Sequence, residues 1–149
     1  MLDIDLLLQK KTFQEITSIA KNGPVYSIPG VTFMSALSDI NGNVLHIIPG
    51  QGYKYYEKPE YVILTNFSPF KGNREKHPWM GMDRYRTAEE LLSKATGTFD
   101  VKECFDILKA CSQVVCPTVV SMVFDVNEMK VYWCENRQWN KIERREFFR

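Results

Sequence analysis

An asparagine is the first residue in this sequence whose type and position suit it to chemistry. Asn66 follows the apolar run at residues 61–65, so its side-chain amide is expected where a buried strand ends and a loop begins. An amide NH₂ group donates two hydrogen bonds without changing its charge, which suits it to stabilising an oxyanion. A local turn or cap role is the alternative that the sequence leaves open.

Two arginines form the second candidate. Arg84 and Arg86 stand at the start of a predicted helix, where the helix dipole favours anions, so helix stability alone does not explain them. One interpretation pairs an arginine with Asp83, Glu89 or Glu90. The other interpretation points one arginine into the site that the asparagine lines.

The other chemistry-bearing residues give weaker signals. His77 is a candidate general base, but no paired nucleophile is visible in the sequence. The cysteines contain no Cys-x-x-Cys, and the two histidines lie far apart, so we predict no metal site and no cofactor. The cysteines are either small apolar core residues or carry a thiol function. They are Cys104, Cys111, Cys116 and Cys134.

Composition and charge exclude several functions. The chain has 149 residues, with 19 Lys+Arg against 18 Asp+Glu and 44% apolar residues. A net charge of +1 provides no basic field for nucleic acid or an anionic membrane, and the aromatic-basic stretch at 53–56 is interpreted as a surface strand or loop. No apolar run approaches the roughly 20 residues of a membrane span. We expect one domain over residues 1–149, binding neither nucleic acid nor membrane.

The first residues predict the compartment. The sequence begins MLDID, with acids where a secretory signal would carry basic residues. We therefore expect a cytoplasmic protein whose cysteines stay reduced.

Hydrophobic periodicity predicts the first elements. Residues 3–22 have helical spacing and end before a glycine and a proline, which predicts one amphipathic helix. The apolar runs 31–37 and 44–48 flank Asn41-Gly42, the sequence typical of a hairpin with a type I′ turn. Residues 61–65 are expected to follow as a buried strand.

The second half of the chain predicts two helices and three strands. A long loop over residues 67–81 precedes a helix at 83–95. Asp100, with Glu103 three residues later, is typical of a capping box that starts the second helix. The strands are expected at residues 118–124, 130–134 and 142–147. Segregated hairpins and helix pairs indicate an α+β layered architecture.

Several short motifs, taken in order, resemble a known family. LSDINGNV at 37–44, VILTNFSPF at 62–70 and DRY at 83–85 are similar to the C-terminal half of a group of N-terminal nucleophile (Ntn) hydrolases. That group comprises choloylglycine hydrolase, penicillin V acylase and acyl-coenzyme A:6-aminopenicillanic acid acyltransferase. The resemblance covers about residues 24–147. It implies the C-terminal portion of an αββα layered sandwich that hydrolyses or transfers acyl groups at linear carbon–nitrogen amide bonds.

The resemblance also implies roles for two residues. Asn66 matches the family asparagine whose amide stabilises the oxyanion, and Arg84 matches the arginine near the nucleophile. The family's nucleophile is a cysteine at the mature N-terminus, whose α-amino group, with a pKa of roughly 7.7–8.0, acts as the base. This sequence begins Met1-Leu2 and has no cysteine before Cys104.

The missing nucleophile shapes the expected function. We expect the polypeptide to be inactive alone, and a sheet face left bare to be covered by an identical copy or by a separate chain with the N-terminal half. A small amide is the expected ligand. The competing hypothesis is a noncatalytic module that binds a small ligand or a protein.

Overall fold

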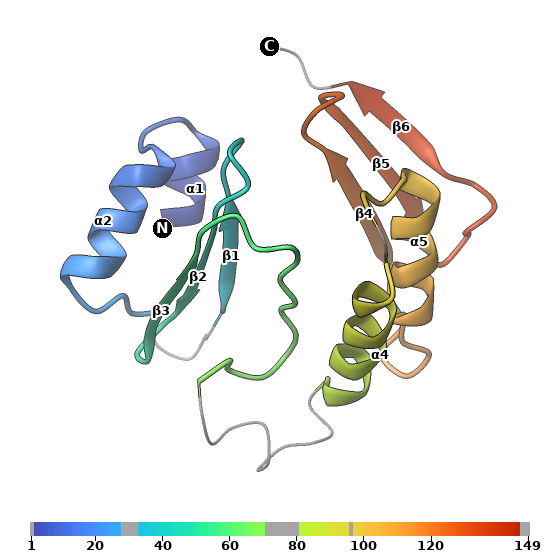
Figure 1. Cartoon of the computed structure of the whole chain (residues 1–149), viewed down its shortest axis with the longest axis horizontal. Helices are drawn as coiled ribbons and strands as arrows, with labels where there is room; N and C mark the ends of the chain where they lie inside the picture. Colours follow the sequence, from blue (N-terminus) through green and yellow to red (C-terminus); the bar gives the residue numbers. More distant parts are fainter. Residues whose placement is uncertain (1, 28–32, 71–80, 96, 147–149) are drawn as a thin grey trace. The chain divides into compact units, whose positions relative to one another are not determined.

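The computed structural model describes residues 2–27, 33–70, 81–95 and 97–146, and the chain divides into two compact units (Figure 1). The first unit is Met1–His77 and the second is Pro78–Arg149. Each unit combines helices with a three-stranded antiparallel sheet, which confirms the α+β class. The Ntn sandwich and the single domain stay predictions.

The first unit packs its helices against one face of a sheet with the order β1-β2-β3 (Figure 1). Ser38 lies opposite Val44 in the first strand pair, and Ile48 lies opposite Gly52 in the second. The elements are α1 (Leu2–Leu7), α2 (Phe13–Asn22), β1 (Ser35–Ser38), β2 (Val44–Ile48) and β3 (Gly52–Tyr56).

The single helix predicted over residues 3–22 is wrong, because α1 and α2 are separate helices. Gln9, between them, has a φ of 55°, which a continuous right-handed helix excludes. Thr12 then starts α2 with a capping box: its Oγ1 accepts from the Glu15 amide at 3.2 Å, and the Glu15 carboxylate accepts from the Thr12 amide at 2.7 Å. This box satisfies amides at a new helix start, while the apolar spacing runs on across the break.

The core of the first unit lies between the helices and one sheet face. Successive strand residues point to opposite faces, so Leu45 and Ile47 face the helices while His46 and Ile48 face away from them. Both sets are buried. The core cluster consists of Phe13, Ile16, Ala20, Leu45 and Ile47.

The predicted hairpin is confirmed, but its turn is not type I′. Gly42 has a φ of 81°, whereas Asn41 lies outside the positive-φ region that type I′ requires at both positions. The Asp39 side chain accepts from the Asn41 and Asn43 amides at 2.9 Å each, which fixes a longer turn with one left-handed residue. The first strand begins at Ser35, later than predicted.

The buried strand predicted at residues 61–65 is wrong. These residues are half-buried and form no strand. The central strand β2 already has β1 on one side and β3 on the other, and β3 follows it through a short turn. Because each strand has only two ladder edges, the local partner β3 leaves no place on β2 for the later segment.

Part of the predicted loop is packed on the sheet. Ser68 and its neighbour Phe67 are buried, and the Ser68 hydroxyl donates to Oε1 of Gln51 at 2.6 Å. The Lys54 ammonium donates to the carbonyl of Pro69 at 3.0 Å. Residues 71–80 of this loop, including His77, lie outside the described residues.

The second unit follows the predicted order closely. It packs α5 against α4 and β4, and its sheet has the order β4-β5-β6. The predicted helices and terminal hairpin are confirmed, and the final strand begins one residue later than predicted, while residue 147 lies outside the described residues. The elements are α4 (Met82–Ser93), α5 (Val101–Ala110), β4 (Val120–Asp125), β5 (Lys130–Glu135) and β6 (Glu143–Glu146).

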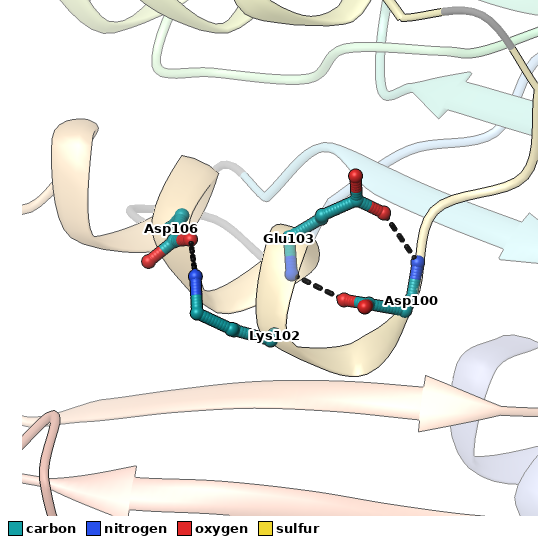
Figure 2. Close-up of polar contacts among 4 residues, drawn as sticks. All are labelled: Asp100, Lys102, Glu103 and Asp106. Atoms are coloured by element: carbon teal, nitrogen blue, oxygen red, sulfur yellow. Dashed lines mark hydrogen bonds and ion pairs between the residues drawn. The ribbon is translucent and has the colours of Figure 1, made fainter.

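The start of α5 shows why the sequence located this helix well (Figure 2). Oδ1 of Asp100 accepts from the Glu103 amide at 2.7 Å, and the Glu103 carboxylate accepts from the Asp100 amide at 2.8 Å. One turn further, Lys102 pairs with Asp106 at 2.6 Å. The predicted capping box is therefore confirmed.

The strand β4 separates buried from exposed side chains. Ser121 is buried opposite the buried Cys134. The alternate residues Val120, Met122 and Phe124 are 45%, 48% and 59% exposed. Since alternate residues share a face, this side of β4 presents an apolar surface. No helix in the described residues is long and apolar enough to cross a membrane.

Candidate functional site

Asn66 is an exposed residue at a bend, held by the residues that follow it. Phe67 and Ser68 are each 6% exposed, and the Ser68 hydroxyl is hydrogen-bonded to Gln51, the last residue of the turn between β2 and β3. The expected strand before Asn66 does not form, and the two residues after it are buried. An exposed amide on an anchored bend can donate to a ligand from outside the sheet.

Arg84 is half-buried in the first turn of α4, where the second helix of the unit meets it. Its backbone carbonyl accepts a long hydrogen bond of 3.6 Å from Sγ of Cys111. Burial raises the pKa of the Cys111 thiol, the positive charge of Arg84 opposes that rise, and Asp83 adds to it. The contact fixes the start of α4 against the end of α5.

One of the three carboxylates considered as a partner for the arginines is paired with a lysine. Glu90 pairs with Lys94 at 2.6 Å, one helical turn further along α4. Arg86 is exposed, whereas Arg84 is half-buried. Of the two arginines, Arg84 is thus the one held in a defined environment.

The structure places the two predicted site residues in different units. Asn66 belongs to the first unit and Arg84 to the second, and each is positioned by contacts within its own unit. A shared site for them stays a prediction. The third candidate, His77, lies outside the described residues.

The cysteines differ in burial. Cys134 is 1% exposed, Cys104 and Cys111 are half-buried, and Cys116 is exposed, and all four are free. Burial raises the pKa of the first three thiols, and the acidic Asp100, Glu103 and Asp125 raise that of Cys104 further. A raised pKa lowers the thiolate fraction, which favours a packing role for these three. The described residues contain no group of side chains that could hold a metal ion.

Sequence reasoning missed a buried histidine. His46 is 1% exposed in the middle of β2, and neither ring nitrogen has a hydrogen-bond partner among the described residues. Burial, and secondarily the charge of Lys54, lowers the pKa of its imidazole. The sequence signal that could have found this histidine is its position in the apolar run VLHII, because a strand with such a run is buried on both faces.

A hollow of about 590 Å³ lies in the first unit between α2 and the strand ends. Lys21 stands at one side with its ammonium 5.2 Å from the centre of the Tyr55 ring. Acidic, amide, hydroxyl and aromatic side chains make up the rest of the lining. It is formed by Phe13, Gln14, Thr17, Ser18, Lys21, Asn22, Asp39, Asn41, Asn43, Tyr55 and Glu57.

Comparison with known proteins adds no family to this description. Protein-family models, curated proteins and solved structures give no match to the chain. The class that the fold itself defines is mixed α+β, built from two antiparallel sheets with helices packed on them.

Proposed function

We propose that this chain supplies the C-terminal portion of a linear-amide hydrolase or acyltransferase of the N-terminal nucleophile type. The observation that carries the proposal is the exposed Asn66 amide on its anchored bend, within the motif that resembles the family. The composition of the units also supports it, because each has helices packed against an antiparallel sheet. Such helix-and-sheet layers are the components of an αββα sandwich.

In this proposal Asn66 and Arg84 have electrostatic roles. The Asn66 amide donates to the oxyanion that forms when the substrate carbonyl is attacked, and the Arg84 guanidinium serves near the nucleophile. The nucleophilic cysteine is proposed to come from a separate N-terminal half, because the raised pKa values of Cys104, Cys111 and Cys134 disfavour the thiolate form in these three. The chain alone is inactive, and it requires no cofactor.

The proposed partner is a separate chain with the N-terminal half. The exposed apolar residues of β4 support a partner, since apolar patches above a few hundred Å² seldom stay bare. A second copy of this chain is the alternative, and the measured mass of the complex separates the two. Free cysteines support a cytoplasmic location.

The test combines this chain with a polypeptide that carries a Cys-initiated N-terminal half. Release of the amine from a glycine-conjugated bile salt or from penicillin V is the readout. We expect activity only in the mixture. Asn66→Ala should lower kcat by about 10²–10³, the usual loss for one oxyanion donor, while exposed Arg86→Ala serves as the matched control for Arg84→Ala. A mixture that forms a complex but stays inactive would contradict the proposal.

A noncatalytic small-ligand module is the second candidate, and the hollow beside α2 favours it. Lys21 offers a cation, Glu57 an anion and Gln14 an amide, a set suited to a small polar amide with an acidic group. Titration with N-acetylglycine, followed by NMR, should shift the amides around this hollow. Lys21→Met should abolish the shifts. Unchanged wild-type spectra at millimolar ligand would exclude a small-ligand function for this hollow.

A further inference from the structure

His46 is the most unusual buried group in the chain. It is 1% exposed, both ring nitrogens lack hydrogen-bond partners among the described residues, and its ring packs edge-on against Tyr56 with centroids 5.3 Å apart. A buried polar group without a hydrogen bond costs free energy, and a buried cation without an acceptor costs far more. The site therefore favours the neutral imidazole over the imidazolium.

The sheet face that carries His46 is covered by residues 67–70, which we call the latch. His46 lies directly opposite Lys54 in the β2–β3 ladder, so the two side chains share this face. The Lys54 ammonium donates to the Pro69 carbonyl at 3.0 Å and lies 5.5 Å from the centre of the Phe70 ring.

Two further contacts hold the latch. The Ser68 hydroxyl donates to Gln51 and also accepts from the Phe70 amide at 3.3 Å. The Phe70 ring lies close to Gly52. A Cβ added at Gly52 would be 3.5 Å from Cζ of Phe70. The latch therefore rests on the same part of β3 whose lysine faces the histidine.

We propose that protonation of His46 releases the latch from the sheet, which makes this segment a pH-controlled cover. A protonated imidazole would be a buried cation beside the half-buried Lys54, the residue that anchors the latch. Release admits water to the ring and separates the two charges. The proposal does not rest on the catalytic role proposed above, although the latch includes Phe67 and Ser68, the buried residues that follow Asn66.

The charged groups around the histidine support this assignment. On the same face, β3 offers Lys54 and Tyr56, the segment 61–70 offers only Tyr61, and β1 has no titratable side chain. None of these is a carboxylate, so no anion in these elements would stabilise the imidazolium.

The direction of the pH effect follows from the lowered pKa of His46. With the latch open, the imidazole is exposed and titrates near its ordinary value of about 6.5. Below that pH the open state binds a proton that the closed state resists. The opening equilibrium should therefore rise about tenfold for each pH unit, until the pKa of the closed state is reached.

Hydrogen exchange of the Phe70 amide, corrected for intrinsic rates, measures this opening in the whole chain. Between pH 7.5 and pH 5.5 we expect about a tenfold rise in the opening equilibrium of the wild type. His46→Phe keeps an aromatic ring without a proton site and should show no rise. His77→Gln is the matched control and should behave as the wild type.

Three results would overturn the proposal. They are an unchanged Phe70 amide in the wild type, an equal rise in His46→Phe, and an equal rise in the amides of α5, which would indicate global unfolding. If His46→Phe does not fold, NMR titration of the wild-type imidazoles decides. Latch opening must then follow the midpoint of His46, and opening that follows His77 instead rejects the proposal.

Discussion

The two sheets of this protein differ in how their faces are covered. In the first unit, helices cover the face of Leu45 and residues 67–70 cover the face of His46. In the second unit, helices cover one side, while Val120, Met122 and Phe124 remain about half exposed. The first sheet is thus completed by its own chain, and the second presents apolar surface. The difference suggests that stability lies mainly in the first unit and association mainly in the second.

The largest expected effect tests where the stability lies. Leu45→Ala removes a fully buried side chain from the first core and should cost roughly 2–5 kcal/mol of unfolding free energy. Met122→Ala, on the exposed face of β4, should cost about 0.5 kcal/mol or less. Urea denaturation followed by circular dichroism measures both. Equal losses would remove the proposed difference between the units.

The next effect compares the two hairpins. Gly42 takes positive φ in the first hairpin, whereas Met129, with a φ of 53°, does so in the second. Gly42→Ala should destabilise by about 1–2 kcal/mol, and Met129→Gly should stabilise by up to about 1 kcal/mol. Thermal melts measure both, and Gly42→Asn is the control because asparagine tolerates this conformation. A destabilised Met129→Gly would contradict the strain assigned to that turn.

A smaller effect compares the helix starts. Thr12→Ala and Asp100→Ala each remove a capping box, and each should cost about 1 kcal/mol. All three tryptophans belong to the second unit, so their fluorescence reports the Asp100 variant selectively. Thr12→Ser and Asp100→Asn keep an acceptor and should lose little. A large loss at Thr12 alone would show that only α2 depends on its cap.

The smallest effect concerns exposed ion pairs. Lys102 and Asp106 of α5 are joined at 2.6 Å, but both side chains are mostly exposed to solvent (Figure 2). Screening by water leaves such pairs with little net value, so Lys102→Met should not change the melting temperature measurably. Lys94→Met is the matched variant in α4. A clear loss in low salt that disappears in high salt would give these pairs a larger role.

The fold was predictable where local signals were sufficient. The capping box at Asp100 and Glu103 located α5, and alternation around a turn located the terminal hairpin. The segment 61–65 was misjudged because an apolar run does not reveal whether it will join a sheet or pack only through its side chains. The α1–α2 break was missed because its apolar spacing continues through Gln9.

The candidate site was predictable in residue type more than in position. The roles of Asn66 and Arg84 stay predictions, and the structure places the two residues in different units. His46 was passed over because its importance comes from burial on the second face of the sheet and from its opposition to Lys54. The opposition to Lys54 depends on the register of the β2–β3 pair, and the cover on that face comes from residues 67–70, which lie more than twenty positions after His46.

The position of β4 has a consequence for handling the protein. Among the described residues β4 has a neighbouring strand on one side only, which makes it an edge strand of its sheet. Its sequence, VSMVFD, combines high β propensity with a single charge at the end. Such a segment is a template for intermolecular strand addition, and Asp125 is the gatekeeper that limits it. Purification at low concentration will therefore favour the dispersed state.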